Sequence, residues 1–177
     1  VFEMKGPVTG TTSDGGHFGG DTLDYDGPAL TITFQDNAFF ERDLENEHMR
    51  LDATQVIAKL PEREPDPAEH VPANQGDAAV PSIDRLDALG DVTIVSSTVD
   101  APPSWLWAPT LSIENGIIRS PDIVRWEVDG ILTEGRDLTH HLQDGDLLLA
   151  GPTTMTVESG DLAGLKAFAP GGMAWNV

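Results

Sequence analysis

Residues 123–132 read IVRWEVDGIL, two apolar segments separated by Asp129-Gly130. An Asp-Gly pair between apolar segments is a strong hairpin signal, because both central positions of a tight type I′ turn require a positive φ angle. Further turn signals of this kind fall at Asn115-Gly116, Asp144-Gly145 and Ser159-Gly160. This part of the chain is therefore predicted to be a series of antiparallel strands.

Short apolar segments recur between these turns at spacings of roughly 8 to 12 residues, a pattern typical of a sandwich or barrel. They lie at residues 92–95, 111–113, 123–128, 131–132, 147–149 and 155–157. Residues 30–34 alternate apolar and polar side chains, which indicates a half-buried strand. Another strand is expected from about Leu51.

Residues 39–51 contain several good helix formers, with Phe40 and Leu44 at helical spacing, and predict one short helix. Strands do not alternate with longer helical segments, which disfavours a doubly wound α/β fold. The predicted fold is all-β: a single jelly-roll, β-barrel or sandwich of about eight short strands, with long loops and at most one short helix.

The length of 177 residues fits a single domain, residues 1–177. Residues 1–27 are rich in Gly, Thr and Asp and are interpreted as an extended arm. Residues 61–81 are predicted to be a long acidic loop, because proline prevents a helix or central strand there. The prolines of this loop are Pro61, Pro65, Pro67, Pro72 and Pro81.

Acidic residues dominate the charge, with 30 Asp and Glu against 10 Lys and Arg, for a formal net charge of −20. Such self-repulsion destabilises a compact chain in dilute buffer and is screened in concentrated salt. Disorder is the alternative reading, but a hydrophobic content of 39% is sufficient for a core. The composition predicts adaptation to high salt, and the lack of clustered Lys and Arg disfavours direct nucleic-acid binding.

The chain contains no cysteine, which excludes disulfides, thiolate metal sites and cysteine nucleophiles. No run of about 18 apolar residues occurs, so no transmembrane segment is predicted. The first residues have neither a basic start nor an apolar stretch, and no signal peptide is visible in them.

Motifs for nucleophilic catalysis, phosphate loops and dinucleotide binding are missing from the sequence. His140 and His141 are adjacent, so on a strand they point to opposite faces and do not chelate one ion together. One buried, hydrogen-bonded histidine and one exposed histidine are expected. The spacing of this pair also differs from the H-x-H motif of a metal-dependent cupin.

Glu41, Glu45 and His48 fall on one face of the predicted helix and could supply three metal ligands, although a solvated charged face is the favoured interpretation. Loosely bound cations at the Asp-rich turns of residues 24–27 and 144–146 are a weaker expectation. We predict no catalytic residue, no cofactor-binding residue, no metal site and no enzymatic activity.

The segment Trp105-Leu106-Trp107 places two indole rings on the same side of an extended chain. Paired aromatic residues of this kind pack under a loop, form a sugar platform or anchor an interface. Trp105, Leu106 and Trp107 are predicted as interface residues, together with Pro65, Pro67 and Pro72 of the acidic loop.

A short acidic chain of about eight strands with long loops and no catalytic motif resembles the single jelly-roll capsid proteins of icosahedral viruses that infect halophilic archaea. The resemblance spans residues 30–177 and implies a self-assembling structural subunit of a virion. Its partners would be copies of itself or other capsid proteins, and it would assemble in the cytoplasm of a halophilic host. The alternative is a small-ligand-binding β-barrel from a halophile, either a binding protein or a metal-dependent enzyme.

Overall fold

The computed structural model describes residues 2–12, 15–44, 47–62, 83–99, 101–142 and 146–157, and these residues form strands joined by turns, with no helix among them. The strands are β1 (Phe2–Thr11), β2 (His17–Asp26), β3 (Thr31–Leu44), β4 (Glu47–Lys59), β5 (Arg85–Thr98), β6 (Ala101–Glu114), β7 (Ile117–Val128), β8 (Ile131–His141), β9 (Leu147–Leu149) and β10 (Thr154–Val157). They belong to one antiparallel sheet of 10 strands. The fold is therefore all-β, as the sequence predicts.

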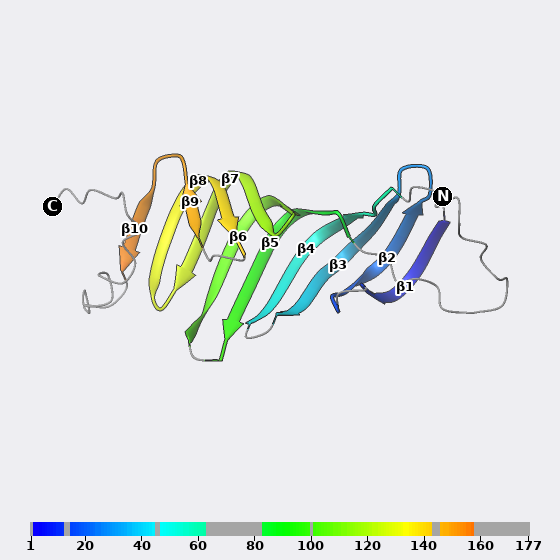
Figure 1. Ribbon diagram of the computed structural model, residues 1–177, viewed down its shortest axis with the longest axis horizontal. Coiled ribbons are helices and arrows are strands. Elements are labelled where there is room, and N and C mark those ends of the chain that lie inside the picture. Colours follow the sequence, from blue (N-terminus) through cyan, green and yellow to red (C-terminus); the bar gives the residue numbers. More distant parts are fainter. Residues whose placement is uncertain are drawn as a thin grey trace, which may run out of the picture.

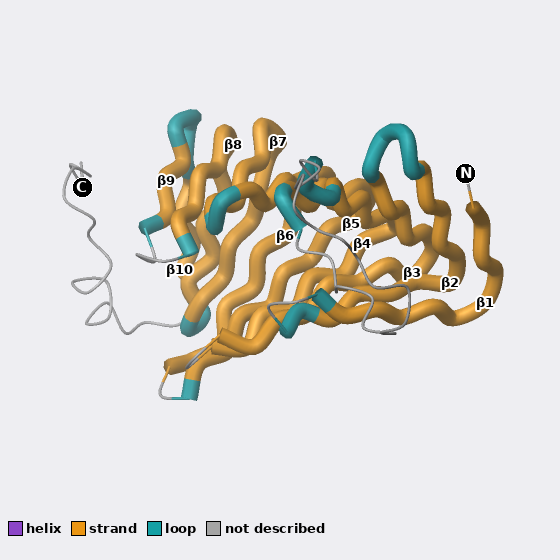
Figure 2. Tube along the Cα trace, turned by 45° about the vertical axis from the view of Figure 1, so that its right-hand side comes forward, coloured by secondary structure: helices purple, strands orange, loops and turns teal. Residues whose placement is uncertain are grey.

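The strands follow one another across the sheet in chain order from β1 to β8, and both β10 and β9 pair with β8. Figures 1 and 2 show this progression along the long axis of the molecule, from β1 at one end to β9 and β10 at the other. A jelly roll is instead built from two Greek keys, whose strands return to non-consecutive neighbours. The predicted jelly-roll topology is replaced by a sequential meander with two open edges.

The longer strands bend in the middle, where the pairing register shifts. In β3 the shift lies between Gln35 and Ala38, and the two residues between them, Asp36 and Asn37, have φ angles of 56° and 53°. Corresponding shifts occur between Lys5/Val8, Gly19/Thr22, Asp52/Gln55, Leu89/Val92, Trp107/Ser112 and Ser120/Ile123. Bulges bend a strand and increase its twist. Because seven consecutive strands have such shifts, the whole sheet folds over on itself.

The contact between two phenylalanine rings shows this folding directly. Phe18 pairs with Phe40 on one side of the bend, yet its ring lies 5.0 Å from the ring of Phe34 on the other side. The apolar interior lies between the two halves of the sheet. Its most buried large side chains are Phe34, Met49, Leu51, Ile118 and Leu138.

Several strand predictions are confirmed, although the strands are longer than expected: β3, β5 and β6 each have 14 residues. Two of the predicted hairpin turns lie within the described residues, and both have the predicted conformation. Asn115 and Gly116 have φ angles of 51° and 71°, and Asp129 and Gly130 have angles of 51° and 73°. Both central residues are thus left-handed, as a type I′ turn requires.

The predicted arm at residues 1–27 is instead a hairpin, formed by β1 and β2 and paired with β3. Its glycines are needed for close strand contact: a Cβ atom on Gly19 would lie 2.6 Å from the carbonyl oxygen of Val8. The glycine-rich composition that suggested an extended arm therefore belongs to a tightly packed pair of strands.

The predicted helix at residues 39–51 is also wrong, since this segment comprises the end of β3 and the start of β4. Its side chains alternate with period two: Ala38 and Phe40 are buried, while Phe39 between them is only partly buried. Most of the predicted loop at residues 61–81 lies outside the described residues.

Candidate functional site

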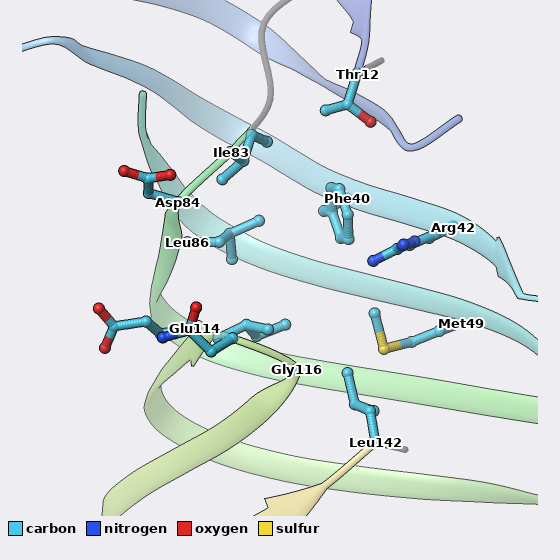
Figure 3. A pocket seen from close by; sticks show the side chains of 12 residues that line it. Thr12, Phe40, Arg42, Met49, Ile83, Asp84, Leu86, Glu114, Gly116 and Leu142 are labelled. Atoms are coloured by element: carbon cyan, nitrogen blue, oxygen red, sulfur yellow. The ribbon is translucent and has the colours of Figure 1, made fainter. Parts of the chain in front are cut away.

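A cavity of about 550 Å³ opens between the two halves of the folded sheet. Its apolar wall consists of Phe40, Met49, Ile83, Leu86, Ile113 and Leu142, and its polar groups belong to Thr12, Arg42, Asp84, Glu114, Asn115 and Gly116. Figure 3 shows Phe40, Met49, Leu86 and Leu142 around the same space. A volume of this size is within the range of about 300–1,000 Å³ typical of small-molecule sites.

The bend in the sheet creates this cavity. Phe40 pairs with Leu51, on the half of the sheet that contains the end of β3. Leu86 pairs with Ala58 and Ile113, on the other half. On a flat sheet Phe40 and Leu86 would be remote from each other, whereas in the folded sheet they line one space.

Arg42 continues the inward-facing row of β3 after Ala38 and Phe40, and it pairs with the buried residue Met49 of β4. The Arg42 Nε atom is buried. In Figure 3 its guanidinium points into the cavity, whereas the carboxylates of Asp84 and Glu114 lie toward the opposite side. The cavity is therefore apolar over much of its wall, with a cation on one side and two carboxylates on the other.

The β1–β2 turn closes the cavity at Thr12. The amide of Gly16 donates a hydrogen bond of 2.7 Å to Thr12 Oγ1, and the amide of Thr12 donates one of 2.8 Å to the carbonyl of Gly16. Thr12 is buried although it belongs to a turn. These bonds hold Thr12 to Gly16 at the cavity wall.

A charged network covers the outer face of β3 and β4 near the same end. Glu41 accepts a hydrogen bond of 3.1 Å from Arg50, which also donates one of 2.8 Å to Asp52. The hydrogen bond from Arg50 to Asp52 raises the pKa of Arg50. His48 Nδ1 lies 2.8 Å from Asp43 Oδ1, so ion pairs of Arg50 and a contact of His48 link the polar side chains of this face.

The predicted metal cluster is only partly assembled by the strands. His48 Nε2 lies 3.8 Å from Glu41 Oε1 across the β3–β4 pair, while Glu45 is outside the described residues. The described part of the chain contains no group of three or more residues arranged to hold a metal ion. The helical spacing that motivated this candidate does not exist in the strands.

His140 and His141 lie at the end of β8, where His140 is partly buried and His141 is exposed. His140 Nδ1 lies 3.1 Å from the carbonyl oxygen of Asp146. The two side chains thus differ in exposure, although the histidine expected to be buried is only partly buried.

The Trp105-Leu106-Trp107 segment belongs to β6, with Leu106 buried in the interior and both indoles on the outer face, partly buried. Trp107 borders a shallow hollow of about 500 Å³ together with Pro109, Ile123 and Arg125. The predicted same-side placement of the indoles is confirmed, and their role in an interface stays a prediction. Pro65, Pro67 and Pro72 lie outside the described residues.

Comparison with known proteins bears on the architecture. No protein-family model and no curated protein sequence matches this chain. The fold is similar to that of LptH. This protein of Pseudomonas aeruginosa is described as the LptA homologous periplasmic component of the conserved lipopolysaccharide transport device. The superposition has a TM-score of 0.57 at 9% sequence identity and covers 88% of this chain and 96% of LptH.

This likeness corrects the prediction of a viral capsid subunit. The sequential, bent meander is shared with a periplasmic transport component over nearly the full length of that protein, and nothing in the comparison points to a virion. The capsid function and the virion location implied by the resemblance were wrong, and the comparison does not support capsid proteins as partners. Acidic composition and short apolar segments are compatible with many β architectures, so they do not identify a capsid protein.

Among the described residues, no helix has the length and apolar character needed to cross a membrane.

The sequence reasoning missed the residues of the cavity. Phe40, Arg42 and Met49 fell in the predicted helix, and Leu86 was assigned to no element. Residues 38–42 read AFFER, without any alternation of apolar and polar side chains, so only the strand pairing shows that Ala38, Phe40 and Arg42 occupy alternate, inward positions. An arginine at the next inward position of a strand marks a polar group directed into an apolar interior.

Proposed function

We propose that this protein binds the apolar chain of an amphiphile between the two halves of its bent sheet and carries it through water. The observation that supports this most is the cavity of about 550 Å³, whose apolar wall lies at one end of the continuous interior. Burial of apolar surface favours binding by roughly 25 cal/mol per Å² before the costs of association are subtracted. A hydrocarbon chain suits such a site because it needs no hydrogen-bond partners along its length.

The likeness to LptH supports the same proposal from an independent direction. LptH is described as a component of lipopolysaccharide transport, and lipopolysaccharide is an amphiphile with acyl chains. A sheet folded around an apolar interior can shield the acyl chains of any such amphiphile from water. We infer a carrier that works outside the cytoplasmic membrane, in keeping with the periplasmic location described for LptH.

We also propose that copies of the protein, or related transport components, join through the open edges of the sheet. Within the described residues, β1 pairs only with β2, and its Phe2 and Met4 side chains are exposed. At the other end, β9 and β10 pair only with β8. Unpaired backbone groups on edge strands are a template for pairing with another chain, and joining opposite edges would align the interiors of successive copies.

Amphiphile binding is tested by lipid extraction from the natively purified protein followed by mass spectrometry, and by titration with a fluorescent fatty-acyl probe. Ile113→Trp would place a large ring into the cavity, because Ile113 pairs with Leu86 and Ile118 on the inward face. Ser112→Trp is the matched control, since Ser112 directly precedes Ile113 in β6 and therefore faces the opposite side of the sheet.

We expect Ile113→Trp to weaken probe binding at least tenfold, while Ser112→Trp leaves it within about twofold. The proposal fails if the unaltered protein neither retains lipid nor binds the probe. It also fails if both tryptophan variants weaken binding equally while retaining the circular dichroism spectrum of the unaltered protein.

A further inference from the structure

A second hollow, of about 500 Å³, lies on the outer face of the sheet, where β5, β6 and β7 bend. These neighbouring strands change register at Leu89/Val92, Trp107/Ser112 and Ser120/Ile123. Bulges re-aim side chains and bend the strands that contain them. Three neighbouring bulges therefore bring side chains of three strands around one space. The lining includes Asp91 and Thr93 of β5, Trp107 and Pro109 of β6, and Ile123 and Arg125 of β7.

The side chains of Thr93, Trp107 and Arg125 form a row across these strands. Thr93 pairs with Trp107, and Trp107 pairs with Arg125. Their neighbours in the chain, among them Leu106 and Val124, are buried, so the row faces outward. Trp107 itself is only partly buried. The hollow thus presents an aromatic ring with a hydroxyl group on one neighbouring strand and a guanidinium on the other.

The polar groups of the hollow include both donors and acceptors of hydrogen bonds. Asp91 is exposed at the bulge of β5, and its carboxylate is an acceptor. Arg125 Nε donates a hydrogen bond of 2.9 Å to Glu134 Oε2, which orients the guanidinium and uses one of its five N–H donors. The hydroxyl of Thr93 can donate and accept. This set of groups complements a ligand that is rich in hydroxyl groups.

We propose that this hollow binds a neutral carbohydrate, with one face of a pyranose ring against the indole of Trp107. A pyranose has an apolar face of C–H groups and an edge of hydroxyl groups. The C–H groups match the electron-rich face of the indole, and the hydroxyl groups match Asp91 and Arg125. This inference is independent of the proposed function, because the described linings of the hollow and of the cavity at Phe40 have no residue in common.

Two other classes of ligand fit the hollow less well. A hydrocarbon chain would remove Asp91 and Arg125 from water without giving them hydrogen-bond partners, which opposes binding. An anion would be repelled by Asp91 and by the net charge of −20. A neutral sugar meets neither penalty. Its affinity should also be the same at 1 M and at 3 M NaCl, because it has no charge for salt to screen.

The test uses the methyl glycosides of glucose, galactose, mannose and N-acetylglucosamine as probes. Glucitol is the control probe, because this acyclic polyol has hydroxyl groups but no rigid C–H face. Binding to the full-length protein is measured by saturation-transfer NMR and by titration of the indole N–H signals at both salt concentrations. At least one glycoside should bind saturably in the millimolar range, as suits one open contact face, and should shift the signal of Trp107. Glucitol should not.

Substitutions locate the site. Trp107→Ala should weaken glycoside binding at least tenfold, and Trp107→Phe should retain part of it. Asp91→Asn should weaken binding about three- to tenfold, and asparagine tolerates the φ angle of 49° at this position. Trp105→Ala is the matched control and should leave the affinity unchanged. Trp105 lies on the same face of β6 but is not part of the described lining.

The proposal is overturned if none of the four glycosides binds saturably, or if glucitol binds as tightly as they do. Equal weakening by Trp105→Ala and Trp107→Ala would also overturn it. Absence of sugar binding, together with a lower mass of Trp107→Ala in light scattering, would instead identify the hollow as a protein interface. The comparison of probes on the unaltered protein decides the matter even if Trp107→Ala fails to fold.

Discussion

Replacement of Gly90 by alanine tests whether the bend in β5 depends on close contact with β4. Gly90 has a φ angle of 77°, and a left-handed conformation costs an L-residue roughly 1–2 kcal/mol. A Cβ atom at this position would also lie 2.8 Å from Thr54 Oγ1 and 2.9 Å from Thr54 Cβ. The hydroxyl can rotate away, but the Cβ atom is attached to the backbone of β4 and moves only if the strands separate.

Overpacking of this kind costs typically about 1–3 kcal/mol. The steric cost and the cost of the left-handed conformation together predict that Gly90→Ala lowers the free energy of unfolding by roughly 2–5 kcal/mol. The matched control is Gly116→Ala in the β6–β7 turn. Gly116 has a φ angle of 71° and no atom within 4 Å of an added Cβ, so this variant should lose only the conformational part, about 1–2 kcal/mol.

The assay is guanidinium unfolding followed by tryptophan fluorescence, with salt held constant for all variants. A second comparison places Gly90→Ala in a Thr54→Gly background, where the contacting atoms are removed. The cost of Gly90→Ala should then fall to that of Gly116→Ala. Equal destabilisation by Gly90→Ala and Gly116→Ala in the unaltered background would refute the argument that the bend forces β4 and β5 into close contact.

Three further perturbations follow from the fold. Phe34→Ala removes a fully buried ring that contacts Phe18 across the bend, and it should reduce the free energy of unfolding by about 3–5 kcal/mol in the same assay; a loss below 1 kcal/mol would contradict a packed interior at that point. Replacing Phe2 and Met4 of the edge strand with lysine should reduce the mass measured by light scattering, because charged edges resist strand pairing. Val99→Lys changes an exposed apolar side chain in the β5–β6 connection, and an equal effect from that variant would argue against pairing through β1. Raising NaCl from 0.1 M to 3 M should increase the urea midpoint, because salt screens the net charge of −20; a midpoint independent of salt would exclude adaptation to high salt.

Local signals predicted the turns and many of the strands correctly. Asn115-Gly116 and Asp129-Gly130 carry their conformational requirement in two adjacent residues, so the sequence is sufficient to predict them. The segment at residues 39–51 failed because charged residues and helix formers are equally compatible with a solvated strand face. There, Glu41 and Arg50 form a cross-strand ion pair, whereas Glu41, Glu45 and His48 are at helical spacing when read along the chain.

The bend and the cavity could not be predicted from the sequence, for a different reason. Turn-forming residues inside strands, such as Asp36-Asn37 and Gly90-Asp91, appear as interruptions and suggest loops, whereas in the sheet they are bulges. Only the alignment of such bulges across neighbouring strands folds the sheet over. Phe40 and Leu86 then line one cavity, although the sequence gives no reason to associate them.

The consecutive order of β1 to β8 gives this architecture a simple route for changing its size during evolution. Each of these strands pairs with its neighbours in the chain, so duplication or deletion of one hairpin would add or remove two strands without rethreading the others. Arrays stabilised by nearest-neighbour contacts grow by such unit steps. The size of the apolar interior between the two halves of the sheet can thus be adjusted by the number of hairpins in one copy.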